Sequence, residues 1–258
     1  MIKLKKVLGI SAFYHDSAAA IVVGNKVIAA AQEERFNREK HSAVFPVEAI
    51  KHCLQTAKLR LDELDAIVFY DKPLLKFERL LQTYYAFAPK GLVSFLKAIP
   101  VWLDEKLFLK QKIYKGLLEV EHYDKKKLKL LFSEHHLSHA AGAFYPSQFE
   151  EAAILTIDGV GEYATTTLAV GRQNKISILK EMHFPHSVGL LYSTFTYVLG
   201  FYFYSGEYKL MGLAPYGEPK YADLILEKLI DLKEDGSFAM DMAYFNYCQG
   251  LTMTGTKF

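Results

Sequence analysis

The sequence predicts an α/β protein, because short apolar strands bounded by turn residues alternate with helical segments along the chain. Four segments carry this prediction. A three-strand pattern over residues 7–34 returns over residues 154–182. Between them, Pro46 opens PVEAIKHCLQTAKL, whose apolar residues recur at helical spacing, and LDAIVFYD then reads as a further strand.

The two three-strand segments share one plan of strand, polar turn, strand, short turn and strand. The first reads VLGIS, AFYHD, SAAAIVVG, NK and VIAAAQEE, and the second reads ILTID, GVGEY, ATTTLAVG, RQNK and ISILKEM. Ser11 and Asp158 end the first strand of each copy. The match is one of pattern more than identity, so two unrelated β-meanders remain an alternative.

A duplicated strand-turn-strand unit suits a nucleotide-binding protein. Small residues at a turn let backbone N–H groups approach an anion, and two such turns that face each other can clamp a polyphosphate. Actin, sugar kinases and heat-shock ATPases use this two-lobed architecture. We therefore expect a first lobe over residues 1–150, with a helical insertion at about 72–127 broken at Pro89 and Pro100, and an incomplete second lobe over 151–258.

Composition excludes several classes of protein. The formal net charge of +2 gives no global attraction to nucleic acid or to an anionic membrane. Cys53 and Cys248 lie far apart without a CxxC pair, which indicates a reducing cytoplasm and no disulfide framework. The uncharged stretch from Ser187 to Gly206 is long enough to cross a bilayer, but Ser and Thr residues interrupt it and no basic cluster flanks it. We interpret it as a helix buried in protein.

The segment SEHHLSHAAGAFYP, residues 133–146, is the strongest local signal for a metal site. If it is helical, His135 and His139 lie four residues apart on one face and can share one ion, whereas His136 points elsewhere. The glutamate of an HExxH protease motif is missing. Two neutral imidazoles need at least one carboxylate to balance a divalent transition metal. Surface or capping histidines remain the alternative interpretation.

Asp158 is the carboxylate that could complete such a site. It ends the apolar strand AAILTID, and Gly159 and Gly161 of DGVGEY let the backbone turn sharply beside it. A carboxylate at the C-terminal edge of a strand in an open α/β sheet faces the crevice where ligands bind. An Asp that stabilises its own DG turn is the alternative.

Two further segments contain candidate functional residues. His15 and Asp16 occupy the turn of the first hairpin, where a histidine could bind an anion or take a proton from a hydroxyl, although a simple turn former is an equal alternative. The stretch SGEYKLMGLAPYG, residues 205–217, predicts a loop that wraps a nucleotide, with Lys209 balancing phosphate charge near Glu207. As a bare pattern it also fits an ordinary surface loop.

Taken in order, four segments resemble the N-terminal region of the NodU/CmcH family of O-carbamoyltransferases. They are GISAFYHDSAAAIVVGNKVIAAAQEERFNREKHSAVFP, SEHHLSHAAGAFYPS, LTIDGVGEYATTT and HSVGLLYSTFTYVLGFYFYSGEYKLMGLAPYG. Together they cover nearly the whole chain in collinear order. In that family an actin-like domain moves a carbamoyl group from carbamoyl-adenylate to a hydroxyl of a small molecule. A second domain makes the carbamoyl-adenylate from carbamoyl phosphate and ATP.

The resemblance assigns roles to individual residues. It implies that a metal, typically Fe(II), is held by His135, His139 and Asp158, and that His15 lies near the transferred carbamoyl group. It also implies a set of residues that hold ATP or carbamoyl-adenylate at the two hairpin turns and in the SGEYKLMGLAPYG segment. This set is Ser11, Gly159, Val160, Gly161, Glu207, Lys209 and Gly212.

The resemblance further implies another acidic ligand and a carbamoyl-adenylate-forming domain that have no counterpart in residues 1–258. We therefore expect a fragment or split gene product that needs a C-terminal half and is inactive alone. Two other functions stay open: an actin-like kinase or ATPase that uses Mg²⁺, and a non-catalytic nucleotide- or metal-binding module that joins a partner chain.

Overall fold

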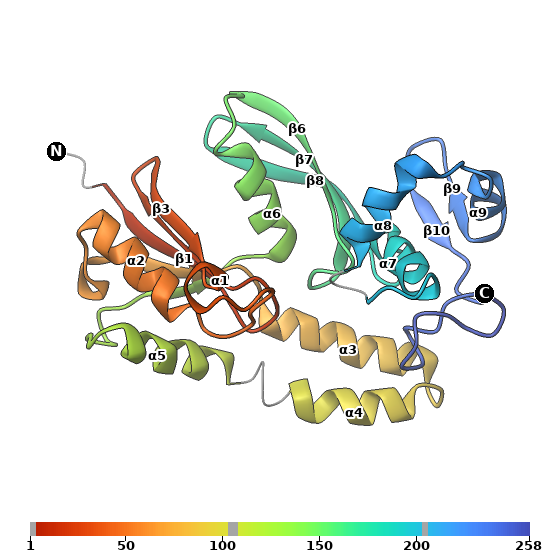
Figure 1. Cartoon of the computed structure of the whole chain (residues 1–258), viewed down its shortest axis with the longest axis horizontal. Helices are drawn as coiled ribbons and strands as arrows, with labels where there is room; N and C mark the ends of the chain where they lie inside the picture. Colours follow the sequence, from red (N-terminus) through yellow and green to blue (C-terminus); the bar gives the residue numbers. More distant parts are fainter. Residues whose placement is uncertain (1–3, 103–107, 203–205) are drawn as a thin grey trace. The chain divides into compact units, whose positions relative to one another are not determined.

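The computed structural model describes residues 4–102, 108–202 and 206–258, and it has the mixed α/β architecture that the sequence predicts (Figure 1). The chain divides into two compact units. The first unit comprises Met1–Leu74 and Val101–Glu134, and the second comprises Leu75–Pro100 and His135–Phe258. The boundary therefore falls before the histidine-rich helix rather than at residue 150, because that helix packs on the second sheet. The assignment of these units to actin-like lobes stays a prediction.

The first unit contains a five-stranded mixed sheet. The order is β3-β2-β1-β4-β5, in which β1, β2 and β3 are antiparallel and β4 and β5 run parallel to β1. The strands are β1 Lys6–Ser11, β2 Ala18–Val23, β3 Lys26–Gln32, β4 Ala66–Phe69 and β5 Leu130–Phe132, and the helices are α1 Glu34–Asn37, α2 Val47–Ala57, the 3₁₀ turn η1 Leu61–Glu63 and α5 Leu109–Val120. The predicted meander and the predicted strand in LDAIVFYD are both present.

An apolar core lies between this sheet and the helices α2 and α5. Leu8 and Ile67 of the sheet are fully buried, and Ile50 of α2 and Ile113 of α5 pack into the same cluster. The helices fit because their apolar residues recur at three- and four-residue spacing along one face. Pro46 is the N-cap of α2 rather than its first helical residue.

The second unit contains the second meander as an antiparallel sheet of order β6-β7-β8. Its strands are β6 Glu151–Ile157, β7 Ala164–Arg172 and β8 Lys175–His183, and the helix α6 His135–Phe144 packs on them. A separate hairpin joins β9 Ile230–Leu232 to β10 Phe238–Met240, after the helix α9 Ala222–Lys228. Within the described residues, no strand pairs with the outer edge of β6.

The stretch from Ser187 to Gly206 is a shorter helix than the sequence suggested. The helix α7 covers Val188–Val198 and ends before Gly200, whose positive φ of 83° stops it. Thr194 is buried, but Tyr197 and Leu199 are exposed, so the described part of the stretch is only partly buried, while residues 203–205 lie outside the described residues. Among the described residues, no helix has the length and apolar character needed to span a membrane.

The segment over residues 72–127 is helical, as predicted, but one of the two predicted breaks is wrong. The helices α3 Pro73–Phe87 and α4 Leu92–Trp102 flank Pro89, which does separate them. Pro100 lies inside α4, where the helix continues through it. The lysines at 125–127, which follow α5, are exposed.

Candidate metal centre

His135, His139 and Asp158 meet at one point of the second unit. The Nε2 atom of His135 lies 2.6 Å from Oδ2 of Asp158 and 3.0 Å from Nε2 of His139. The Nε2 atom of His139 is 3.9 Å from the same Asp158 oxygen. One donor atom from each residue lies within 4.8 Å of the other two. The predicted juxtaposition of two imidazoles from one helix with the carboxylate of the DG turn is therefore present.

The start of α6 is fixed by a carboxylate from the turn between β6 and β7. The backbone N–H of His135 donates to both oxygens of the buried Glu162 carboxylate at 3.0 Å. A carboxylate at this position satisfies an unpaired N–H group and complements the positive end of the helix. Gly161 allows the close approach, because a Cβ there would lie 2.9 Å from the ring of His136 and 3.1 Å from that of His135. The sequence analysis missed Glu162, since nothing in DGVGEY pairs it with a distant helix.

The start of α7 also fixes the turn that contains Asp158. The buried Ser187 hydroxyl donates to the Gly159 carbonyl at 2.7 Å, and it accepts a bond from the Leu190 N–H at 3.0 Å. At Gly189 a Cβ would lie 2.4 Å from the carbonyl oxygen of Asp158, so only glycine fits there. The Asp158 carboxylate also accepts the N–H of Gly159 at 2.7 Å.

Arg79 of α3 supports the same turn, and the sequence analysis did not single it out. Its Nη1 donates to the Gly161 carbonyl at 2.8 Å, and its guanidinium lies 5.3 Å from the centre of the Phe184 ring. The segment that the sequence assigned to an insertion thus contributes a residue that positions the candidate site.

His136 ties α6 to the sheet instead of joining the cluster. It is buried, its Nε2 lies 2.8 Å from the Ala164 carbonyl, and its Nδ1 lies 2.6 Å from Oγ1 of Thr156. Because a carbonyl only accepts, Nε2 carries the proton and the Thr156 hydroxyl donates to Nδ1. Thr156 in turn lies 2.7 Å from the Thr167 hydroxyl. Burial lowers the pKa of His136, which keeps the ring neutral.

The electrostatics of the cluster favour the forms that bind metals. Burial opposes ionisation of Asp158. The hydrogen bond from His135 and the charge of that ring outweigh burial and hold the pKa of Asp158 well below the ordinary range. Burial and the charge of His135 lower the pKa of His139. These shifts favour an ionised Asp158 and a neutral His139, which are the states in which these two residues bind a metal ion.

Two imidazoles and one carboxylate fit a divalent transition metal such as iron, which such a set binds while leaving coordination positions for other ligands. Mg²⁺ prefers oxygen ligands, so the donor set fits it poorly. His139 has 54% of its side chain exposed and Asp158 has 31%, so solutes can reach the donor atoms.

A family model described as the carbamoyltransferase N-terminus matches residues 6–258. The chain belongs to this family. The recognition made from the four sequence segments is therefore confirmed.

Two relatives of this carbamoyltransferase domain are considerably longer than the chain. An uncharacterized protein of Synechocystis sp. is 61% identical over 98% of the chain, which matches 41% of that protein. The nodulation protein NolNO of Sinorhizobium fredii is 38% identical over 88% of the chain, which matches 31% of it. The chain thus spans less than half the length of these relatives. YeaZ from Pseudomonas aeruginosa, a solved structure, aligns with 70% of this chain and 68% of its own at a TM-score of 0.35 and 15% identity.

The structure places the other predicted residues of the carbamoyltransferase domain in both units. Ser11 ends β1 and His15 lies in the following turn, both in the first unit. Val160 lies with Gly159 and Gly161 in the turn after β6, beside the candidate metal centre. Their predicted contacts with a nucleotide stay predictions.

The predicted nucleotide loop of residues 205–217 is mainly helical, which corrects the sequence expectation. The helix α8 covers Glu207–Leu213 and the 3₁₀ turn η3 covers Ala214–Tyr216, whereas Ser205 lies outside the described residues. Glu207 accepts a bond from the Ser193 hydroxyl at 2.8 Å. Lys209 and Gly212 are exposed on α8. The run EYKLM lacks any breaker, so helix propensity prevails over the glycines that follow.

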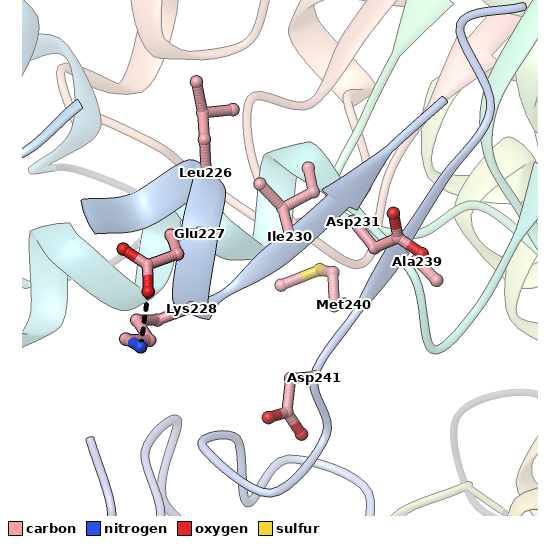
Figure 2. A pocket seen from close by; sticks show the side chains of 8 residues that line it. All are labelled: Leu226, Glu227, Lys228, Ile230, Asp231, Ala239, Met240 and Asp241. Atoms are coloured by element: carbon pink, nitrogen blue, oxygen red, sulfur yellow. Dashed lines mark hydrogen bonds and ion pairs between the residues drawn. The ribbon is translucent and has the colours of Figure 1, made fainter. Parts of the chain in front are cut away.

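A cavity of about 390 Å³ lies beside α9 and the β9–β10 hairpin (Figure 2). Its walls are Leu226, Glu227, Lys228, Ile230, Asp231, Ala239, Met240 and Asp241. Figure 2 marks an ion pair between Glu227 and Lys228, which are neighbours in the sequence. None of the predicted site residues lines this cavity, and we assign it no role.

Proposed function

We propose that this chain supplies the acceptor-carbamoylating site of an O-carbamoyltransferase. In this reaction the carbamoyl group of carbamoyl-adenylate passes to a hydroxyl of a small molecule, such as a sugar or secondary metabolite. The observation that carries the proposal is the convergence of His135, His139 and Asp158 in a member of the carbamoyltransferase family.

The cluster is proposed to hold a divalent transition metal, Fe(II) by resemblance to the family. Bound there, the ion would supply Lewis acidity toward phosphate or carbamoyl oxygens. The chain's own residues orient the donor atoms: Glu162 fixes the start of α6, while Ser187 and Arg79 fix the turn that carries Asp158. Such outer contacts set the geometry and the basicity of metal ligands.

The turn between β1 and β2 is proposed to activate the acceptor. A neutral hydroxyl is a poor nucleophile, so His15 takes its proton at a ring nitrogen as the oxygen attacks the carbamoyl carbon. The new C–O bond forms, the bond from that carbon to the phosphate oxygen breaks, and AMP leaves with its electron pair. Deprotonation of His15 by solvent completes the cycle.

The glycine-rich turn of residues 159–161 is proposed to face the adenylate with its backbone N–H groups, together with Ser11 of the first hairpin. Glu207, Lys209 and Gly212 are proposed to lie on the nucleotide side. Carbamoyl phosphate and ATP are proposed to react in a second domain, supplied by a longer form of the protein or by a partner chain.

A metal-binding measurement tests the site directly. Isothermal titration of the chain with Fe(II) or Co(II) under nitrogen should show one site, and Asp158→Ala or His139→Ala should weaken it by at least about 100-fold, since each removes a ligand. His183→Ala is the matched control, because this exposed histidine, whose ring contacts Glu181 at 2.8 Å and the edge of Tyr163, donates no atom to the metal cluster. Equal affinity in all four proteins would contradict the metal centre.

An activity measurement tests the reaction. The chain, mixed with the C-terminal part of the Synechocystis relative, carbamoyl phosphate, ATP and a panel of sugars and polyols, should yield carbamoylated product detectable by mass spectrometry. Asp158→Ala should reduce product formation by a factor of 10² or more, roughly. Release of ADP with a phosphorylated acceptor would instead support an actin-like kinase.

A further inference from the structure

His41 and His15 share one carboxylate in the first unit. The Nδ1 atom of His15 lies 2.7 Å from Oδ2 of Asp16, and the Nδ1 atom of His41 lies 3.2 Å from Oδ1 of the same residue. The side chains of His15, Asp16 and His41 are 46%, 36% and 44% exposed, so solutes reach all three. Two histidines thus occupy the two oxygens of one carboxylate.

The segment that carries His41 is fastened to the β1–β2 turn by backbone hydrogen bonds. The N–H of Phe13 donates to the Ala43 carbonyl, and the N–H of Ser17 donates to the Ser42 carbonyl, both at 2.9 Å. The amide of Asn37 donates to the Ser42 hydroxyl at 3.0 Å. Residues 38–45, between α1 and α2 (Figure 1), are therefore built onto the turn that presents His15.

Four residues in this small region have a left-handed backbone. The φ angles are 69° at Phe13, 51° at Asp16, 64° at Arg38 and 57° at His41. Asp and His adopt this conformation more readily than most residues, but a bulky Phe rarely does. Backbone strain of this kind persists where surrounding contacts enforce it, and it concentrates at functional sites. An ordinary solvated turn does not require two histidines on one carboxylate, nor the backbone strain that accompanies them here.

The shared carboxylate determines where the protons lie on both rings. An ionised carboxylate only accepts, so in the neutral rings the proton lies on Nδ1 and the lone pair on Nε2. His41 binds Oδ1 and so holds the carboxylate in the orientation that directs Oδ2 at His15.

We propose that Asp16 and His41 are positioning residues for His15, with His41 acting through Asp16. The proposal rests on the proposed function, in which His15 takes the proton of the acceptor hydroxyl. His41 does not touch the reacting atoms in this scheme. Its contribution is to fix the carboxylate, and through it the tautomer and orientation of the His15 ring.

The first test measures the tautomer and needs no activity. In the chain with ¹⁵N-labelled histidine, long-range ¹H–¹⁵N spectra should show His15 protonated at Nδ1. Asp16→Gly, which removes the carboxylate and tolerates the positive φ of this position, should redistribute the proton between both nitrogens, and His41→Gly should do so partly. Glycine removes the donor and tolerates the positive φ at this position. His41→Asn, which keeps an N–H donor near the place of Nδ1 and also tolerates positive φ, should restore the wild-type spectrum.

His52→Gln is the matched control. His52 lies inside α2, where glycine would weaken the helix, and its exposed ring lies beside Phe36, with ring centroids 5.7 Å apart. Its His15 signals should match the wild type. If His41→Gly also leaves the His15 signals unchanged, the proposal is overturned, whether or not carbamoyl transfer is ever detected.

The second test is a double-mutant cycle on carbamoyl transfer. His41→Gly should lower kcat about tenfold without changing KM for the acceptor, the size expected for loss of one charge-assisted hydrogen bond. In the Asp16→Gly background the same substitution should have no further effect, because His41 acts through Asp16. Independent, multiplicative losses would overturn the proposal, as would full activity of His41→Gly. Absence of transfer by the wild type contradicts the proposed function, and the tautomer measurement then decides alone.

Discussion

The two meanders have the same strand order but different interiors. Around β1–β3 the first unit buries a large apolar cluster, which includes Leu8 and Ile67. Around β6–β8 the apolar cluster consists of Ala140, Phe144, Ile154 and Ala169, and threonines with His136 fill buried positions beside it. The comparison shows that one backbone plan can be stabilised mainly by apolar burial or by a satisfied polar network.

The turns of the two meanders differ in the same way. The β1–β2 turn is held by backbone bonds to residues 42 and 43, whereas the β6–β7 turn is held by the side chains of Glu162, Ser187 and Arg79. Side-chain supports place Asp158 against α6 at defined positions. This difference supports the proposed metal centre, whose ligands need such fixed positions.

The largest expected effect separates the two interiors. Leu8→Ala should destabilise the protein by about 3–5 kcal/mol, because it leaves a cavity in the large apolar cluster, and Ile154→Ala by roughly 2–3 kcal/mol. Urea denaturation combined with hydrogen exchange at β1 and β6 measures both. An equal or larger loss for Ile154→Ala would show that the second interior depends on apolar burial as much as the first.

A smaller effect is expected from the polar network. His136→Phe keeps a ring but leaves the Thr156 hydroxyl and the Ala164 carbonyl without their histidine partner, which should cost about 1–3 kcal/mol. His183→Phe, at an exposed position, should change stability by less than about 0.5 kcal/mol. Thermal unfolding followed by circular dichroism compares them. If His136→Phe is as stable as the wild type, the hydrogen bonds of His136 make no net contribution to the free energy of unfolding.

The smallest effect concerns pH. Burial lowers the pKa of His186, whose Nδ1 accepts the Met240 N–H at 3.0 Å. The unfolded chain then binds more protons than the folded one, so this contribution to stability is present above the unfolded pKa of about 6.5 and is lost as pH falls through the lower folded value. The loss should not exceed about 1.4 kcal/mol per pH unit.

His186→Asn provides the matched variant for the pH measurement. Its Oδ1 can accept the same N–H without titrating. The free energy of unfolding of this variant should fall less steeply between pH 7 and pH 5, roughly, than that of the wild type. If the free energy of unfolding, measured by urea denaturation, depends on pH equally in both proteins, His186 does not contribute to the acid sensitivity.

Much of the second unit followed from local pattern. The i, i+4 spacing of His135 and His139 already placed both rings on one face of a helix, and the alternation in ATTTLAVG already indicated a strand. The extents of α7 and α8 did not follow, because tertiary contacts and terminal glycines decide where a helix ends. The contact between His41 and Asp16 was not predicted either, because only backbone pairing between distant segments brings these two residues together.

By itself the sequence determined the two meanders, the helix with its pair of histidines and the family to which the chain belongs, because residue periodicity and long motifs are local properties. The tertiary structure decided that Asp158 meets that pair, that Glu162 caps their helix and that His136 turns into the sheet. Those contacts depend on how α6 packs against β6 and β7, and the energy of that packing is shared among residues far apart in the chain.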